Sequence, residues 1–185
     1  IIPSPYWVSY PDIVRLCGGK PVVCETTFEK GFKITADELE KKITNKTKWF
    51  IINSPSNPTG AVYSAQELKK ISELLIKYPN IQILSDDIYE HVLYGDMKFT
   101  NILNVEPNLY KRTFIVNGVS KVFSMTGWRI GYGAGDKSFI KSMSKIQSQC
   151  TTNPCSISQM AAMFALQNDK KFLEDWLKKF NERKN

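Results

Sequence analysis

Residues 49–60 read WFIINSPSNPTG, a continuous apolar run that passes directly into a loop with three serine or threonine residues, two asparagines and two prolines. Four large apolar residues in a row are typical of a strand that is buried on both faces, as in a parallel sheet. The prolines restrict the backbone that follows, so the loop is stiff. This stretch therefore predicts a central strand and a rigid polar loop at its carboxyl end.

Two capping boxes predict helices on either side of this strand. Thr35 and Glu38 are three residues apart and predict a helix that continues to about Ile43. Ser64 and Glu67 repeat the pattern after the loop. The apolar residues that follow share one helical face, and they are Leu68, Ile71, Leu74 and Leu75. The central strand is therefore expected to lie between two helices.

Further apolar runs extend the same alternation along the chain. Strands are expected at residues 22–24, 81–84, 113–116 and 129–133, and helices at 138–149, 156–166 and 172–184. Strands that alternate with helices favour an α/β domain with a mainly parallel sheet flanked by helices. Ligands of such sheets bind at the carboxyl ends of the strands. Three polar segments follow three of the strands, so we expect residues 53–60, 85–89 and 117–121 to meet at one edge.

The composition is that of a globular protein of one domain, with 185 residues, 42% of them apolar and 23% charged. No apolar stretch approaches the roughly 20 residues of a membrane span. The net charge is +7, but the lysines are scattered and form no basic stripe interleaved with aromatic residues, which argues against nucleic-acid binding. The chain opens as if at the end of a strand and stops within a helical pattern, so we expect it to be truncated at both ends.

The cysteines argue against a metal site. The four cysteines contain no Cys-x-x-Cys pair, and the one histidine is distant from them in the sequence. Reduced thiols of a cytoplasmic protein are the simplest interpretation.

The first two polar segments each allow two interpretations. Asn57 precedes Pro58, which disfavours helical geometry, so this segment is either a rigid surface turn or a loop that holds the Asn57 amide in place. Asp86 and Tyr89 are three residues apart and would share one side of a helical turn. Asp86 is either the N-cap of a short helix or part of a site. The adjacent acid Asp87 would repel Asp86 unless a positive charge were near.

The third segment carries the most informative residues. Residues 118–131 read GVSKVFSMTGWRIG, with Lys121 among small and apolar residues at a strand end. Lysine is seldom buried, and desolvation lowers its pKa and makes it a nucleophile for carbonyls. Arg129 follows eight residues later and offers a planar fork that suits phosphate. The plain alternative is a surface lysine and an arginine that is paired with a carboxylate.

Residues 118–131 resemble, along their whole length, the cofactor-attachment signature of class I aminotransferases, which depend on pyridoxal phosphate (PLP). Three other motifs resemble parts of this family in the family's order: the loop at 56–60, the Asp86-x-x-Tyr89 pair and the segment PYWVSYP at 5–11. The resemblance covers essentially the whole chain and is nearest to the bacterial aspartate aminotransferase branch. It implies that residues 1–185 are the three-layer, PLP-binding large domain of a fold-type I transferase, without the small domain.

The resemblance implies three catalytic roles. Lys121 would hold PLP as an internal aldimine, and its freed amine would then move a proton between the substrate Cα and the cofactor. Asp86 would face the pyridine nitrogen and keep it protonated, which makes the ring a better electron sink. Tyr89 would donate to the phenolic oxygen of the ring.

The resemblance also implies binding roles for three residues. Asn57 would bind the phenolic oxygen and could reach the substrate carboxylate, Arg129 would bind the phosphate, and Trp7 would lie against the ring and the substrate. Gly118 stands where some branches have a serine that binds the phosphate, so one phosphate contact is missing. Asp87 is expected to be structural. His91 is expected to be solvated or at the edge of the core, within a helical stretch.

The expected activity is transfer of the amino group of aspartate to 2-oxoglutarate, with amino acids and 2-oxo acids as the small-molecule substrates. The resemblance also implies a cytoplasmic homodimer with its active site at the interface. Transamination of prephenate or of another amino acid, or β-lyase chemistry on the same fold, fits the same motifs. An alternative without catalysis is a dimerisation fragment that keeps the motifs by descent.

Overall fold

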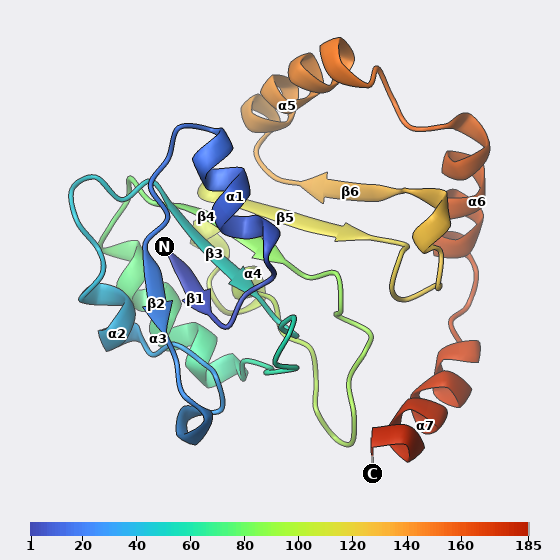
Figure 1. The fold of residues 1–185 in the computed structure, drawn as a ribbon, viewed down its shortest axis with the longest axis horizontal. Coiled ribbons are helices and arrows are strands. Elements are labelled where there is room, and N and C mark those ends of the chain that lie inside the picture. Colours follow the sequence, from blue (N-terminus) through green and yellow to red (C-terminus); the bar gives the residue numbers. More distant parts are fainter. Residues whose placement is uncertain (185) are drawn as a thin grey trace.

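The computed structural model describes residues 1–184, which form an α/β arrangement around one central sheet (Figure 1). The four-stranded part runs in the order β3 (Trp49–Asn53), β4 (Gln82–Asp86), β5 (Thr113–Gly118) and β6 (Gly131–Ala134). A parallel pair, β1 (Ile2–Ser4) and β2 (Val23–Glu25), extends it. The Ile51 amide donates to the Ile1 carbonyl over 3.0 Å, so β1 lies beside β3.

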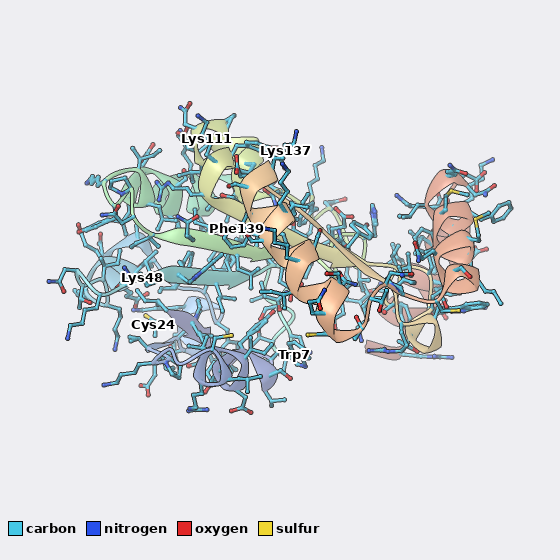
Figure 2. The ribbon with its side chains drawn as sticks, turned by 90° about the horizontal axis from the view of Figure 1, so that it is seen from above. Trp7, Cys24, Lys48, Lys111, Lys137 and Phe139 are labelled. Carbon is cyan, nitrogen blue, oxygen red and sulfur yellow. The ribbon has the colours of Figure 1, made fainter. Side chains whose placement is uncertain are left out.

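Alternate side chains of β3 pack on opposite faces of the sheet. Phe50 and Ile52 are buried against α3 (Ala65–Ile76), whose apolar residues form the largest core cluster. Ile51 lies on the other face in a cluster with Tyr10 of α1 (Ser9–Leu16). Successive residues of a strand point to opposite faces, so a run that is apolar throughout requires cover on both. Helix α1 and helix α3 provide it, and the layers can be followed in Figure 2.

The remaining helices surround the sheet and its carboxyl edge. They are α2 (Ala36–Glu40), α4 (Ile102–Val105), α5 (Lys137–Cys150), α6 (Ser156–Gln167) and α7 (Phe172–Lys184), with 3-10 turns η1 (Phe28–Lys30), η2 (Pro107–Arg112) and η3 (Thr126–Trp128). Among the residues described, no helix is both long and apolar enough to cross a membrane.

Strands β5 and β6 form an antiparallel hairpin, the exception in an otherwise parallel sheet. Gly118 pairs with Gly131, and residues 119–130 form the connecting loop. Val119 and Ile130 at the base of this loop pack on Ala162 of α6. Figure 1 shows the loop end of the hairpin beside α6, away from the layers formed by β1 to β4. The third polar segment of the sequence is therefore held at its base by a small apolar cluster.

The predicted fold class is confirmed: the strands are mainly parallel and helices flank them. Both capping boxes form, at Thr35 and at Ser64. Several details differ from the expectations. Helix α2 ends at Glu40 rather than near Ile43, helix α1 was not predicted, and residues 88–91 form a turn, so His91 does not lie in a helix. Strand β6 begins at Gly131 because Arg129 has a left-handed backbone, with φ of 57°.

Candidate active site

The carboxyl ends of the three parallel strands lie in one row. Asn53 of β3 pairs with Asp86 of β4, and Asp86 pairs with Val116 of β5. Residues 54–60 and 87–89 leave the sheet from this row, whereas β5 continues to Gly118 before residues 119–121 follow, and the three polar segments meet at one edge as predicted. The register of a parallel sheet, rather than sequence proximity, brings them together.

The carboxylate of Asp86 is held from both sides. The Tyr10 hydroxyl donates to Oδ2 over 2.5 Å, and the Ile88 amide donates to Oδ1 over 3.2 Å. Burial raises the pKa of Asp86, and these two hydrogen bonds oppose that effect. Burial and the neighbouring Asp86 charge raise the pKa of Tyr10, so its hydroxyl stays protonated and remains a donor. Tyr10 was not among the predicted site residues, although it lies within the PYWVSYP segment.

Trp7 precedes α1 and lies beside Tyr10 of that helix. Its ring contacts the Tyr10 ring edge-on, with centroids 5.5 Å apart and planes at 86°. The Trp7 side chain is 43% exposed, so much of the indole remains free to contact another group. The structure therefore joins Trp7, Tyr10 and Asp86 in one line of contacts from α1 to β4.

Asn53 locks the first polar segment onto the second. Its Nδ2 donates to the Asp86 carbonyl over 2.9 Å, and its Oδ1 accepts from the Asn57 amide over 2.8 Å. The peptide bonds Ser54–Pro55 and Asn57–Pro58 are cis. Asn57 is partly buried, and the Asn53 side chain connects its backbone to that of Asp86 through two hydrogen bonds. The loop thus belongs to the site edge, and Asn53 is a second positioning residue that sequence reasoning did not single out.

Lys121 and Tyr89 come together although they leave different strands. The Lys121 ammonium nitrogen lies 5.6 Å from the centroid of the Tyr89 ring. Lys121 is exposed in this chain, so the structure does not show the desolvated lysine that the sequence pattern suggested as one of two interpretations. The physical reason is its position in the hairpin loop, which projects beyond the row of strand ends.

Arg129 lies in the same hairpin loop as Lys121. Its side chain is exposed, and Nη1 donates to the Thr126 carbonyl over 2.8 Å. A left-handed backbone at a non-glycine residue is uncommon and turns the chain sharply into β6. The structure therefore places Arg129 and Lys121 on the same loop between β5 and β6. Binding of phosphate by Arg129 stays a prediction.

Gly118 is closely surrounded at the start of the hairpin loop. A Cβ atom there would lie 3.0 Å from the Ile130 carbonyl oxygen and 3.1 Å from the Ile88 side chain. Both distances are shorter than ordinary van der Waals contacts, so a serine at this position would force its neighbours apart. Packing therefore accounts for the glycine where some branches of the resembled family carry a hydroxyl.

Asp86 and Asp87 do not face each other. Asp86 points toward Tyr10 and α1, whereas Asp87 is buried with Ser85 and Asn101 on the side of α4. Strand alternation turns the two carboxylates to opposite faces, which separates them, although the Asp86 charge still contributes to the raised pKa of Asp87.

A cavity of about 540 Å³ lies at the other edge of the sheet. It is lined by residues that begin β3 and β4, Trp49 and Gln82, together with Lys48, Lys111 and Phe139. Figure 2 shows Lys48, Lys111 and Phe139 apart from Trp7. Within residues 1–184, no group of three or more His, Cys, Asp and Glu side chains could hold a metal ion. The edge that carries Asp86 and Lys121 is thus the candidate site.

A partly buried carboxylate, a lysine and three polar segments lie together at the carboxyl edge of a parallel sheet, where ligands of such sheets bind. The sequence profile of the family described as aminotransferase class I and II matches residues 1–185. The chain belongs to this family.

The relatives point to one branch of the family. The chain is 58% identical over 174 residues to a probable aspartate/prephenate aminotransferase of Rickettsia typhi, covering 94% of the chain and 44% of the relative. It is 53% identical over 184 residues to the aspartate/prephenate aminotransferase of Cereibacter sphaeroides, covering 100% of the chain and 46% of the relative. The chain therefore spans less than half the length of these relatives.

Solved structures agree with the sequence comparison. The crystal structure of the aspartate aminotransferase from Rhizobium meliloti matches with a TM-score of 0.97 and 47% identity, covering 98% of this chain and 46% of that one. The aspartate aminotransferase of Thermus thermophilus with maleate matches with a TM-score of 0.87 and 41% identity, again over 98% of this chain and 46% of that one.

Proposed function

We propose that the protein containing this chain is a PLP-dependent aminotransferase that moves the amino group of aspartate to 2-oxoglutarate. The observation that carries the proposal is the partly buried Asp86 carboxylate, held by Tyr10, at the same sheet edge as the Lys121–Tyr89 pair. The names of the relatives, aspartate/prephenate aminotransferases, support the same choice. In this proposal residues 1–185 are the PLP-binding large domain.

The donor set at this edge suits PLP. A bound PLP ring supplies an electron sink for the carbanion that forms at the substrate Cα. Asp86 would accept the pyridinium N–H, because its carboxylate is oriented by the Tyr10 hydroxyl and the Ile88 amide. Tyr89 and Asn57 would donate to the phenolic oxygen of the ring. In this arrangement the ring N–H would meet an acceptor and the phenolic oxygen would meet two donors.

The remaining predicted residues attach the cofactor and move the proton. Lys121 would attach the PLP aldehyde, and its amine is placed to hold and move the proton at the substrate Cα. Arg129 would bind the phosphate, because its planar fork can make paired hydrogen bonds. The exposed indole of Trp7 would provide an apolar contact to the ring and the substrate.

Prephenate is a second candidate amino acceptor. The relatives at 53–58% identity are named for both aspartate and prephenate, which favours a second substrate at the same site. Turnover of aspartate with 2-oxoglutarate, compared with turnover of aspartate with prephenate, separates the two. Release of pyruvate and ammonia without a 2-oxo acid would instead indicate lyase chemistry.

The oligomer and the compartment belong to the same proposal. We infer a homodimer, which sedimentation of the full-length protein would test. All four cysteines are free thiols, which suits a reducing cytoplasm.

The decisive experiment locates the cofactor on the full-length protein. PLP is added, the protein is reduced with borohydride, and the pyridoxyl adduct is mapped by peptide mass spectrometry. We expect the adduct on Lys121. We also expect Lys121→Ala to lose the adduct and to lower turnover by at least about a hundredfold, because one amine provides both attachment and proton transfer.

Lys137→Ala is the matched control, since Lys137 is an exposed lysine beyond the same hairpin. It should retain the adduct and the activity. An adduct on another residue, or normal turnover of the Lys121→Ala protein, would overturn the assignment.

A further inference from the structure

Asp87 is a buried carboxylate that the proposed chemistry does not use. Its side chain is 5% exposed and lies one residue beyond the end of β4. The Ser85 hydroxyl donates to Oδ1 over 2.8 Å, and the Asn101 amide nitrogen donates to Oδ2. The Asp87 amide also donates to the Val116 carbonyl of β5 over 3.0 Å. Both the backbone and the side chain of Asp87 are therefore tied to neighbouring elements.

Asn101 connects this cluster to helix α4. Its Oδ1 accepts from the Leu103 amide over 2.8 Å, which makes it the N-cap of the helix. Its Nδ2 also lies 3.3 Å from the Ser85 hydroxyl oxygen. Asp87 and Asn101 thus close the two ends of residues 88–100 onto β4. We call Ser85, Asp87 and Asn101 the Asp87 clamp.

The segment closed by the Asp87 clamp carries groups of the candidate site. The Ile88 amide donates to the Asp86 carboxylate, and the Tyr89 ring lies beside Lys121. Both residues follow Asp87 directly in the sequence, so a shift of the Asp87 backbone would displace both contacts.

Glu90 ties the same segment to the hairpin strand. Its Oε1 accepts from the Asn117 amide nitrogen over 2.8 Å, and Asn117 in turn accepts from the Gly118 amide. The segment therefore lies between β4 and the loop that carries Lys121.

We propose that Asp87 is a positioning residue: through the Asp87 clamp it holds the Asp86 carboxylate and Tyr89 in the orientation that binds PLP. The inference rests on the proposed function. Burial of a carboxylate costs more than neutral hydrogen bonds return, and the charged neighbours, Glu90 and Asp86, are both acidic. Stability alone does not account for an acid here, whereas a directional acceptor for two donors does.

The test uses the full-length protein and reverses the polarity of one hydrogen bond. Asn101→Asp keeps the helix cap but replaces the amide donor with a second carboxylate, so the Asp87 clamp should open. The double variant Asp87→Asn with Asn101→Asp restores a donor and an acceptor across the same contact. Asn104→Asp is the control, because it adds the same charge to α4 and keeps an acceptor for the backbone N–H of residue 101.

Three quantities are measured: the PLP dissociation constant of the apo protein, the apparent pKa of the visible cofactor band, and the thermal midpoint of the apo protein. For Asn101→Asp we expect PLP binding to weaken about tenfold. We also expect the apparent pKa of the cofactor band to rise, because Tyr89 no longer donates to the phenolic oxygen. The double variant should return to within about threefold of the starting affinity, and Asn104→Asp should match the parent protein.

The outcomes separate the two proposals. If the parent protein binds no PLP, the proposed function fails. If it binds PLP but Asn101→Asp changes only the thermal midpoint, or the double variant shows no recovery, the positioning role is wrong. If Asn101→Asp does not fold, Asp87→Asn alone replaces it, with an expected weakening of two- to threefold from the loss of a charge-assisted hydrogen bond. Unchanged PLP affinity and an unchanged cofactor band in that variant would equally overturn the inference.

Discussion

At the scale of single residues, the candidate site depends on how two adjacent acids are partnered. The Asp86 carboxylate accepts a hydrogen bond from the Tyr10 hydroxyl. The Asp87 carboxylate accepts hydrogen bonds from Ser85 and Asn101 on the opposite face. Burial raises the pKa of both carboxyl groups. The same residue type therefore acquires two different environments one residue apart, because the strand alternates between faces.

The hydrogen bond from the Tyr10 hydroxyl should lower the pKa of Asp86. In Tyr10→Phe the carboxylate loses one of its two donors, so the pKa of Asp86 should rise further and ionisation should require a higher pH. We expect PLP affinity to fall about tenfold, with the acid-side midpoint of the affinity profile moved to higher pH. Titration of the apo full-length protein with PLP between about pH 5 and pH 8 measures both effects.

Tyr6→Phe serves as the control for the Tyr10 variant, because it removes a hydroxyl from the same segment while Tyr10 stays bonded to Asp86. It should leave the profile in place. An identical profile for Tyr10→Phe would show that the hydroxyl does not influence Asp86.

Asp87 should make folding stability depend on pH. Burial raises its pKa from 3.8 to about 6, so the folded state binds a proton more tightly than the unfolded chain in this range. The free energy of unfolding should therefore fall as pH rises from about 4 to about 6, by on the order of 2–3 kcal/mol. Asp87→Asn should lack this slope.

Urea unfolding of the apo protein and of Asp87→Asn across the same pH range provides the comparison for Asp87. The difference between the two curves isolates this group from other titrating residues. Parallel curves would mean that Asp87 keeps an ordinary pKa in the folded state.

At the scale of elements, Arg112 secures the carboxyl end of α3. Its guanidinium donates to the carbonyl oxygens of Leu75, Tyr78 and Ile81 over distances of 2.6–3.0 Å. Leu75 lies in the last turn of α3, whose carbonyls lack partners within the helix, and Tyr78 and Ile81 follow that helix, so Arg112 of η2 adds a charged donor to the turn after α3. This contact joins α3 to the start of β5 and fixes the layer that covers Phe50 and Ile52.

We expect Arg112→Met to lower the free energy of unfolding by about 1–3 kcal/mol, because three carbonyl groups lose a charged donor, although those of Leu75 and Tyr78 keep a backbone donor. Arg112→Lys should recover only part of the loss, since an ammonium group cannot reproduce the planar fork. Urea unfolding of the full-length protein measures the change. Lys111→Met, which removes the neighbouring exposed charge, should have little effect, and equal losses at both positions would contradict the capping role.

At the scale of the whole molecule, helix α6 presents two unlike faces. Ser158 and Ala162 are buried toward the hairpin, whereas Ile157, Met160 and Phe164 form an exposed apolar stripe. Ile157 is 70% exposed and Phe164 is 69% exposed. A contiguous apolar stripe of this kind favours association or binding of apolar molecules.

We expect residues 1–185 produced alone to bind an apolar fluorescent dye and to associate as concentration rises. Ile157→Lys combined with Phe164→Lys should reduce both signals, because it interrupts the stripe with charge. Gln159→Lys combined with Gln167→Lys adds the same charge to polar positions of the same helix and should change little. Dye fluorescence and light scattering measure the outcome, and equal effects of the two pairs would show that charge alone is responsible.

Much of this protein could be predicted from local patterns. The apolar run at residues 49–52 predicted a strand covered on both faces, because successive side chains of a strand point to opposite faces and an apolar residue at each position favours cover on both. The capping boxes at Thr35 and Ser64 predicted helix starts, because the hydrogen bonds involved span only three residues. The polar segments were expected at one edge because parallel strands end on the same side of a sheet.

Only the tertiary structure decided which distant groups meet. Tyr10 and Asp86 are 76 residues apart and are joined by packing of α1 on β4, which no local pattern encodes. The exposure of Lys121 depends on how the hairpin loop projects beyond the sheet, and the partners of Asp87 depend on where α4 returns. The sequence by itself determined the elements and the chemical types at their ends, because those follow from short-range hydrogen bonding and side-chain periodicity. Register and layer packing, which act between segments far apart in the chain, decided the site.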